Sequence, residues 1–393
     1  MDEKEVSRNV RFYKLYAILS EPIFWGPTLI LFIQRFGKMS LSEIYLMEAV
    51  VVGGTVLLEI PSGALADLIG RKKTILLGQF FICLSTVLFA IINSPLDVWI
   101  ANILCMVGFV CRSGADSAFL YDSLKEVKRE AEYKQIEGSA MGGRLLTYGI
   151  CSLSVGFLSE ISLRLPFILT IPWLLSSCLI VLCFKEPIQT QKYNFKEQVD
   201  LMKVSVLFVA NNKAVKWVVG YISLIVVSSK LWFFTYNPYF ELVGLEIKYY
   251  GVIFCLLNIV AWFFSYNAFR IERRIGEKFC MIAMILFIGL PILLMSTIVS
   301  QIMVSMVLLQ NVVRGFMVPF LGDFLNRRLD SKNRATVISI KSAVSGFVSV
   351  ISLSLFGFVL KIWPLALSLQ ILGVTVLLLG LIEIIQYRKI FEK

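Results

Sequence analysis

The chain has 393 residues, of which 58% are hydrophobic and 17% are charged, and its mean hydropathy is +0.79. Because a soluble domain is about half apolar and about a quarter charged, this composition excludes a soluble globular protein and predicts one that lies in a membrane. The formal net charge of +11 does not indicate nucleic-acid binding, which would need a folded basic surface that so apolar a sequence does not provide.

Twelve apolar stretches are long enough to cross a bilayer as helices, which takes about 20 residues. The sequence therefore predicts an all-α membrane protein with twelve transmembrane helices. In chain order, the predicted segments are residues 12–36, 41–66, 74–93, 98–121, 138–160, 165–184, 214–243, 249–269, 279–300, 302–325, 335–360 and 364–385.

The distribution of basic residues predicts the orientation of these segments. Of the 38 Lys and Arg residues, 28 lie in the termini and in the connections on the same side of the membrane, and only five lie in connections on the other side. Since cytoplasmic loops carry the excess of Lys and Arg, we expect both termini in the cytoplasm of a multi-pass protein of the cell (plasma or inner) membrane. No cleavable signal is expected, because the first apolar segment is too long for one.

The first two segments carry acids. Glu21 lies in the first segment, one turn before Trp25. An ionisable residue at bilayer depth usually marks a functional site, because inserting it costs about 2.5–3.5 kcal/mol. A carboxyl group removed from water holds its proton more tightly, and the chain has no His, so Glu21 is the best candidate for proton coupling. Glu48 and Glu59 share one face of the second segment, as either an interhelical polar seam or a proton path.

The connection between the second and third segments has a recognisable pattern. Gly63, Asp67 and Gly70 are followed by Arg71 and two lysines. This resembles the cytoplasmic loop signature of the major facilitator superfamily, which is Gly, three residues, Asp, a variable or basic residue, one residue, Gly and two basic residues. The chain departs from it only where Leu68 takes the first basic position. Basic residues that merely fixed the topology would not require the glycines and the Asp at these intervals.

The resemblance implies a cytoplasmic gate at this loop. Asp67 would meet the N-terminus of the eleventh segment, near residues 333–336, where free N–H groups and the helix dipole favour a carboxylate. Arg71 would pair with Asp122 at the cytoplasmic end of the fourth segment. These contacts would join the two halves while the substrate cavity is open outward, and they would break when it opens inward.

The fourth and fifth segments carry Arg112, Asp116 and Arg144. Arg112 and Asp116 are one helical turn apart and can neutralise each other, so they are either a structural pair or part of the coupling machinery. In drug:proton antiporters of the family the fifth segment usually carries a glycine-proline signature, whereas here it begins Gly138-Ser-Ala-Met-Gly-Gly-Arg without a proline. The direction of transport is therefore open at this stage.

The longest polar connection divides the segments into six and six. The sequence predicts an N-terminal six-helix bundle over residues 1–184, a cytoplasmic linker over 185–213 and a C-terminal six-helix bundle over 214–393. An internal repeat supports two pseudo-symmetric halves, because residues 118–124 and 319–325 are similar and each follows an in-membrane Arg. Two six-helix halves are also what the family resemblance implies.

Three bases lie inside the predicted segments of the second half, namely Lys230, Arg314 and Lys341. Lys230 is midway along the seventh segment with no acid within one turn, in an aromatic run that includes Tyr236, so we expect it to face a cavity. The candidates for substrate binding or proton coupling in the whole chain are Glu21, Trp25, Glu59, Arg112, Asp116, Arg144, Lys230, Tyr236 and Arg314.

No metal, cofactor or catalytic centre is indicated. The chain has no His, and its eight Cys lack the paired spacing of a zinc site or a disulfide framework. No phosphate-binding glycine-rich loop or nucleophile motif occurs, so we do not expect an enzyme.

The sequence thus favours a secondary active transporter that moves a small amphiphilic organic solute across the cell membrane by alternating access, in proton-coupled efflux similar to that of bacterial drug exporters. One alternative is an uptake or facilitated carrier of an anionic metabolite, recognised by Lys230 and Arg314. An alternative of another class is a membrane sensor that keeps the fold without transporting. The expected partners are the solute, protons and the lipid bilayer, without nucleic acid, and the protein is expected to be a monomer.

Overall fold

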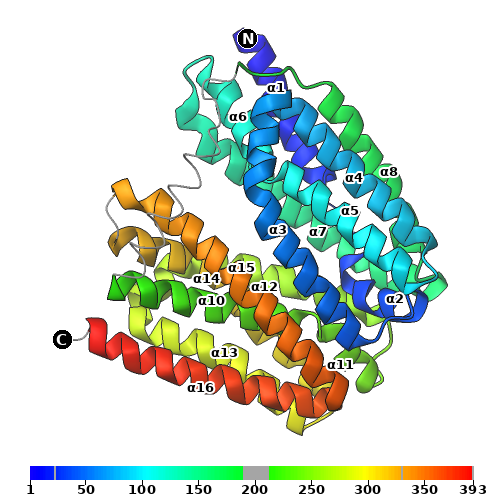
Figure 1. Ribbon diagram of the computed structural model, residues 1–393, viewed down its shortest axis with the longest axis vertical. Coiled ribbons are helices and arrows are strands. Elements are labelled where there is room, and N and C mark those ends of the chain that lie inside the picture. Colours follow the sequence, from blue (N-terminus) through cyan, green and yellow to red (C-terminus); the bar gives the residue numbers. More distant parts are fainter. Residues whose placement is uncertain (22–23, 189–211, 329–330, 392–393) are drawn as a thin grey trace. The chain divides into compact units, whose positions relative to one another are not determined.

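The structure of the protein, a computed structural model, describes residues 1–21, 24–188, 212–328 and 331–391. At positions 60, 326, 328 and 331–339 it describes the backbone alone. Within these ranges the regular secondary structure is entirely helical, with no strand (Figure 1). The protein is therefore all-α, as its apolar segments predict.

The chain forms two compact units, each assembled from separated parts of the sequence. The first contains Met1–Met39, Gly54–Lys196 and Ile247–Cys255, and the second contains Ser40–Gly53, Glu197–Glu246 and Leu256–Lys393. Two long helices, α3 (Leu41–Ile69) and α12 (Lys248–Ile275), contribute one part to each unit. The predicted linker over 185–213 lies mostly outside the described residues, so the division at that linker stays a prediction.

The first unit consists mainly of helices that precede residue 189. Its α4 packs against both α5 and α8, and its α1 packs against α7. Tyr13, Phe119 and Phe184 belong to a buried cluster of this unit. Apart from its parts of α3 and α12, the helices of this unit, blue to green in Figure 1, are α1 (Glu3–Leu19), η1 (Gly26–Thr28), α2 (Leu29–Phe36), α4 (Arg71–Ile91), α5 (Pro95–Arg112), α6 (Ala115–Lys125), η2 (Glu130–Glu132), α7 (Tyr133–Ile161) and α8 (Leu165–Leu182).

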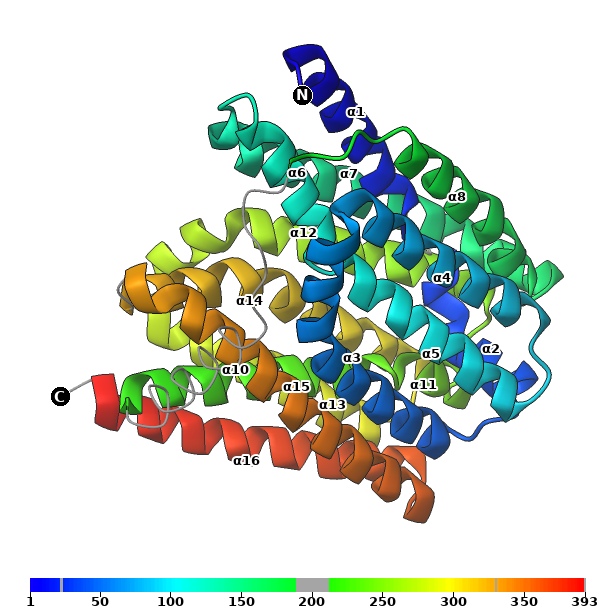
Figure 2. The same ribbon diagram turned by 45° about the horizontal axis from the view of Figure 1, so that its top comes forward.

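The second unit contains the helices that follow residue 211. Its α10 packs against α15, and Figure 2 shows α13 and α16 running side by side, in agreement with their extensive packing. Apart from its parts of α3 and α12, the helices of this unit are α10 (Lys213–Phe233), α11 (Tyr236–Leu242), α13 (Glu277–Thr297), η3 (Gln301–Met306), α14 (Val307–Arg328), α15 (Ser331–Ile362) and α16 (Leu365–Phe391).

Ten helical stretches in the described part of the chain are long and apolar enough to cross a membrane. They correspond to ten of the twelve predicted segments. The other two predicted segments are residues 12–36 and 138–160. The first is divided among α1, η1 and α2, and the second is the continuous 29-residue helix α7, whose many Gly and Ser residues lower its hydropathy. The twelve-helix prediction is consistent with this structure.

Three predicted segments are broken rather than continuous helices. In the fourth segment α5 ends at Arg112, and the chain turns at Gly114, whose φ is +77°, before α6 begins. In the seventh segment α10 ends at Phe233 before α11, and in the first segment α1 ends at Leu19. A helix end inside a membrane leaves backbone groups without helical partners, so polar side chains are needed nearby.

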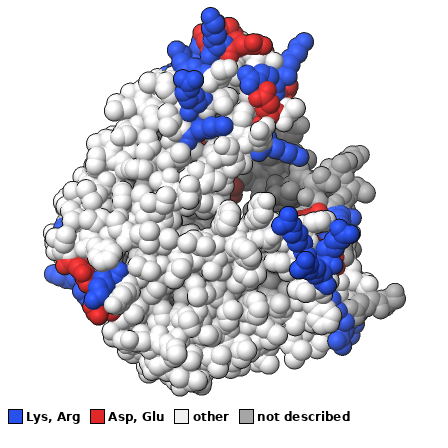
Figure 3. Space-filling model, turned by 180° about the vertical axis from the view of Figure 1, so that it is seen from behind, with Lys and Arg blue, Asp and Glu red and all other residues white. Residues whose placement is uncertain are grey.

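The surface of the protein suits a hydrocarbon environment. On the face shown in Figure 3, charged side chains gather in a few clusters and the rest is uncharged. Large apolar side chains are exposed on several helices, including Phe157 on α7, Trp262 on α12 and Phe358 on α15. So much exposed apolar surface is unusual in a soluble monomer and is expected where helices contact lipid.

Candidate functional site

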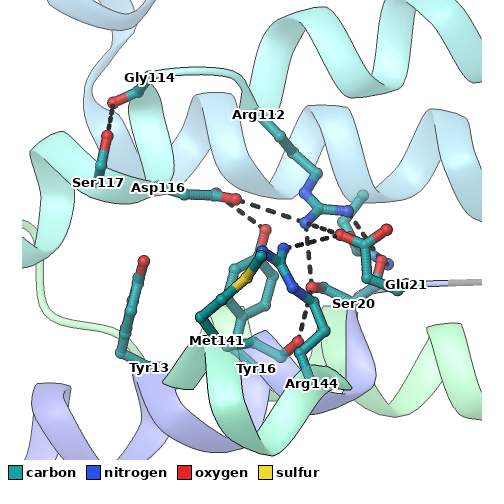
Figure 4. A network of polar contacts seen from close by, with 12 residues as sticks. Tyr13, Tyr16, Ser20, Glu21, Arg112, Gly114, Asp116, Ser117, Met141 and Arg144 are labelled. Atoms are coloured by element: carbon teal, nitrogen blue, oxygen red, sulfur yellow. Dashed lines mark hydrogen bonds and ion pairs between the residues drawn. The ribbon is translucent and has the colours of Figure 1, made fainter. Parts of the chain in front are cut away.

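Two arginines and two acids of the first unit form one polar network (Figure 4). Arg112, at the end of α5, places its Nη2 3.2 Å from Glu21 Oε1 and 3.4 Å from Asp116 Oδ2. Arg144, on α7, brings its Nη1 to 3.2 Å from the same Glu21 oxygen. Glu21 therefore lies between two guanidinium groups, and each acid of the network faces at least one base.

Arg112 also binds the end of α1. Its Nη1 donates to the backbone carbonyl of Ser20 at 2.8 Å, and its Nη2 donates to the Ser20 hydroxyl at 3.0 Å. Because α1 ends at Leu19, the Ser20 carbonyl is a group that the helix itself leaves unsatisfied. Arg112 is only 4% exposed. A buried guanidinium thus links a broken helix end to two carboxylates.

Asp116 is held from two sides. Tyr16 donates its hydroxyl to Asp116 Oδ1 at 2.9 Å, and its ring centroid lies 5.4 Å from Arg112 Cζ. The predicted pairing of Arg112 with Asp116 is present, but the two residues lie on different helices because the segment breaks at Gly114. Sequence spacing did not indicate Tyr16, whose place in the network comes from the packing of α1 against α6.

Arg144 and Glu21 form a more accessible part of the network than Arg112. The side chain of Arg144 is 31% exposed and that of Glu21 is 23% exposed, compared with 5% for Arg112. The pair between Arg144 and Glu21 is therefore partly exposed, whereas Arg112 is buried.

Two predicted site residues of the first unit have other surroundings. Trp25 is 6% exposed and packs edge-on against Phe89 and Phe167, with ring centroids 4.9 and 5.4 Å away, so it is part of an aromatic core. Glu59 is exposed on α3, and its carboxylate has no hydrogen bond or ion pair with any described residue. Neither surrounding indicates a direct part in the network around Glu21.

In the second unit, Lys230 has an acidic partner from a distant part of the chain. Its Nζ lies 3.2 Å from Glu48 Oε1, and the two side chains are 32% and 18% exposed. Lys230 is in the last turn of α10, and Glu48 is on the part of α3 that belongs to this unit. The local sequence around Lys230 contains no acid, but the fold supplies one.

Tyr236 and Arg314 belong to a group of amide side chains in the same unit. The Tyr236 hydroxyl donates to Gln310 Oε1 and accepts from Asn311 Nδ2 at 3.3 Å. Arg314, one turn further along α14, donates from Nη2 to Asn258 Oδ1 at 2.6 Å. These amides were not among the residues predicted from the sequence. The available signal was the adjacent pair Gln310-Asn311 inside an apolar segment, because buried polar residues at membrane depth are rare.

The loop between α3 and α4 holds an ion-paired triad of the first unit. Arg71 Nη2 lies 2.7 Å from Asp67 Oδ1, and Arg71 Nε lies 3.6 Å from Asp122 Oδ2. The pairing of Arg71 with Asp122 that the resemblance implies is therefore present, and Asp67 shares the same arginine. The implied partner of Asp67, near residues 333–336, has no described side chains.

Two glycines set the conformation of corresponding loops in the two units. Gly70 has a φ of +102° and a ψ of +152° just before α4, and Gly276 has a φ of +84° and a ψ of +154° just before α13. Residues with a Cβ rarely adopt a positive φ, so both turns favour glycine. The second loop lacks the Asp of the signature but repeats the backbone geometry of the first. Gly63, the first glycine of the signature, lies inside α3.

Glu186 completes the first of these loops. Its carboxylate accepts from the backbone N–H of Arg71 at 2.6 Å and of Lys72 at 2.9 Å. It therefore caps the start of α4, where the first N–H groups have no helical partner and the helix dipole favours a negative charge. Glu186 was assigned to the linker from the sequence, and no local signal connects it with a loop that lies 115 residues earlier.

An ion cluster in the second unit also consists of one arginine and several acids, but the arginine has a different position. Arg327, at the end of α14, pairs with Glu272 and, at 2.9 Å, with Asp323, while Glu277 lies 3.7 Å away. The hydrogen bond to Glu272 is the largest cause that raises the pKa of Arg327 above its ordinary value. Glu277 directly follows the loop glycine, so an acid takes the position that Arg71 has in the first unit.

Glu383 is a further in-membrane acid, which was not among the residues predicted from the sequence. It lies on α16, and its Oε2 is buried without a hydrogen-bond partner among the described side chains. Its own backbone carbonyl accepts from Trp217 Nε1 at 2.8 Å. The signal was present in the sequence, because Glu383 is inside the twelfth predicted segment.

The described residues contain no group of three or more His, Cys, Asp or Glu that could hold a metal ion.

Known proteins are similar to this chain in sequence and in fold. The family model for the Major Facilitator Superfamily matches residues 23–352. An uncharacterized MFS-type transporter, YxaM of Bacillus subtilis (strain 168), is 24% identical over 377 residues, which cover 88% of this chain and 86% of that protein. A mutant of the nucleoside transporter NupG has a TM-score of 0.80 at 13% identity, with 97% of this chain and 99% of that chain covered. A D-xylose-proton symporter has a TM-score of 0.72 at 13% identity, with 96% and 97% covered.

Proposed function

Because the chain belongs to the major facilitator superfamily, we propose that it exports a small amphiphilic organic solute from the cell in exchange for protons. Membership of the family makes the protein a multi-pass membrane transporter, and such transporters are in general not enzymes. The proposal concerns the direction of transport, the coupling to protons and the character of the solute.

One observation carries the proposal, namely an accessible acid held between two bases in the first unit. Glu21 accepts from Arg112 and from Arg144, each at 3.2 Å. With Glu21 and Asp116 both ionised, the two acids balance the two bases. A proton that binds Glu21 therefore changes the net charge of the network by one. Such a change can be coupled to the binding of a solute, because both act on the same carboxylate.

Competition at Glu21 provides the coupling. While Glu21 is ionised, its carboxylate can bind a donor or cationic group of the solute in place of the partly exposed Arg144. Protonation of Glu21 from the outside removes the negative charge and weakens that contact, so the solute leaves. Loss of the proton to the cytoplasm restores the site. Arg112 stays in place throughout, because Asp116 and Ser20 also hold it.

The loop triad supplies the gate in this proposal. Asp67, Arg71 and Asp122 hold one another in the first unit, and the gate opens and closes as these contacts change during alternating access. A contact that exists in one state only shifts the equilibrium by its differential energy. We place this loop and both termini on the cytoplasmic side of the cell membrane, as the Lys and Arg distribution indicates, with a monomer as the transporting unit.

A second candidate function is uptake of an anionic metabolite together with protons, and the charge balance of the network favours it. When Glu21 is protonated, two arginines face one remaining acid. The excess positive charge can be neutralised by an anion, so proton and anion would bind together. Lys230 and Arg314, which the sequence suggested as the anion-binding bases, contact Glu48 and Asn258 instead.

Proteoliposomes with an imposed pH gradient test the proposed function. Solutes for the assay come from a thermal-shift screen of the purified protein against charged amphiphiles. We expect a solute that binds to move against the direction of proton flow. Movement of the solute in the same direction as the protons would show uptake instead of export. No gradient-dependent flux of any solute that binds would contradict transport and leave a sensor with the family's fold.

The substitution Asp67→Asn is expected to slow transport at least tenfold while the affinity for the solute changes less than about twofold. Asp67 binds Arg71 in the loop triad and has no place in the network around Glu21, so its loss affects the gate rather than the binding of solute. Initial flux in proteoliposomes and equilibrium binding by calorimetry measure the two effects separately. The control is Glu130→Gln, which removes an acid from another loop. Equal losses of rate and affinity would contradict the gate.

A further inference from the structure

An apolar pocket of the second unit contains one base. The pocket has a volume of about 230 Å³ and lies among α10, α14 and α15. Ile222 and Val226 form one wall, Leu321 and Gly322 form another, and Lys341 of α15 supplies the charge. We propose that this pocket binds a small amphiphilic monoanion, with its anionic group on Lys341 Nζ and its aliphatic part against the apolar walls.

Lys341 differs from the other in-membrane bases of the second unit. Lys230 has Glu48 as an ionic partner, and Arg314 has the Asn258 amide oxygen as an acceptor. Lys341 Nζ has neither a hydrogen bond nor an ion pair with any residue whose side chain the structure describes. A base at membrane depth is costly to insert without a partner. A ligand that carries a negative charge would supply this partner.

Two hydroxyl groups near Lys341 are already paired with each other. Ser345, one turn along α15, is hydrogen-bonded to Ser223 of α10 at 2.9 Å between the hydroxyl oxygens. The two hydroxyls therefore satisfy each other at the crossing of these helices. The ammonium group of Lys341 is therefore the charged feature of a pocket whose other lining residues are apolar. A carboxylate on a short hydrocarbon chain is complementary to this arrangement.

The size of the pocket limits the ligand. Pockets for drug-sized molecules have volumes of about 300–1,000 Å³, so a volume of about 230 Å³ favours a smaller molecule. Gly322 is part of this shape, because a Cβ placed on it would meet no atom within 4 Å. A larger residue at position 322 has room for its Cβ and would take up part of the pocket that Gly322 lines, and this provides a test that does not depend on charge.

The inference rests on the proposed function in one respect, since it takes the anion to be the transported solute. It assigns an anionic group to that solute whichever way transport runs. An anionic phospholipid offers the same chemistry, a negative group on an apolar chain, and the experiment has to separate the two sources.

Equilibrium binding of octanoate tests the pocket without requiring transport. The full-length protein in phosphatidylcholine nanodiscs is titrated with octanoate by calorimetry, with empty nanodiscs subtracted and octanamide as the uncharged analogue. We expect Lys341→Gln to weaken octanoate binding at least tenfold with little effect on octanamide, and Lys341→Arg to stay within about threefold of the original protein. Gly322→Leu should abolish the binding of both. Lys361→Gln, at the exposed end of the same helix, is the matched control and should change nothing.

The outcomes are distinct. Octanoate binding that is absent in the original protein, or equal in the Lys341→Gln and Lys361→Gln variants, would overturn the inference. Phosphatidylglycerol in the nanodiscs should leave the affinity for octanoate unchanged. A tenfold loss of that affinity would show that an anionic lipid occupies the pocket, and it would overturn the inference of a soluble ligand. Binding that depends on Lys341 without any flux in proteoliposomes would contradict the proposed function and keep the pocket. Flux of a solute whose binding does not depend on Lys341 would overturn the inference about the pocket and keep the proposed function.

Discussion

Glu21→Gln is expected to abolish proton-driven transport while the protein stays folded. The amide is nearly the same size as the carboxyl group, and its oxygen can still accept from Arg112 and Arg144, which lie 3.2 Å from Glu21 Oε1. It cannot gain or lose a proton in the physiological range. The network would therefore keep its shape and lose the carboxyl group that lies between the two arginines.

Two transport assays separate coupling from movement of the solute. In proteoliposomes, accumulation of the solute driven by a pH gradient should fall to the background. Exchange of labelled for unlabelled solute without a gradient should continue, but at higher solute concentrations, because the uncharged amide binds the solute more weakly than the ionised carboxylate. Glu160→Gln provides the control, because it removes an exposed acid from α7, the helix that carries Arg144. Flux of the Glu21→Gln variant that still follows the pH gradient would remove Glu21 from the coupling and with it the central argument for proton exchange.

Arg112→Met is expected to destabilise the protein by about 3–5 kcal/mol, because it removes the base that pairs with Asp116 and leaves the Ser20 carbonyl at the end of α1 without its donor. Arg112 is 5% exposed in its side chain and contacts Glu21, Asp116 and the end of α1 at Ser20. At about 2–4 °C for each kcal/mol, the expected fall in Tm is roughly 10 °C. Tryptophan fluorescence during heating in nanodiscs measures it.

Arg144→Met is the matched comparison. Arg144 lies at the same 3.2 Å from Glu21 but is 31% exposed, and an ion pair that water can reach contributes only about 0–1 kcal/mol. The double variant Arg112→Met with Asp116→Asn should recover part of the lost stability, because it removes one of the stranded charges. Similar Tm values for the two single arginine variants would show that the network is not buried around Arg112.

The sequence predicted the elements whose cause is local. A run of about 20 apolar residues becomes a membrane helix because the hydrocarbon core excludes polar backbone, and ten of the twelve predicted runs meet this criterion in the structure. The loop from Gly63 to Lys73 was identifiable because its glycines and charges have fixed intervals. The positive φ of Gly70 and the pairing of Arg71 with Asp122 agree with that identification.

The broken helices were harder to predict. Gly114 interrupts the fourth segment although single glycines are tolerated in many membrane helices, and nothing in the spacing shows whether a given glycine turns the chain. The break matters for the site, because it moves Asp116 to a new helix and frees Arg112 to reach the end of α1. The capping of α4 by Glu186 was likewise invisible from sequence, since these residues meet only through folding.

By itself, the sequence determined that the protein is an all-α membrane transporter of a known superfamily, and it identified most of the charged residues at membrane depth. Only the tertiary structure decided which charges meet. Glu21 and Arg112 are 91 residues apart in the chain, and Lys230 finds its acid on α3. Hydrophobic length and loop spacing act between neighbours in sequence, whereas an ion pair across helices depends on how those helices pack, and the same pattern of apolar residues allows many packings.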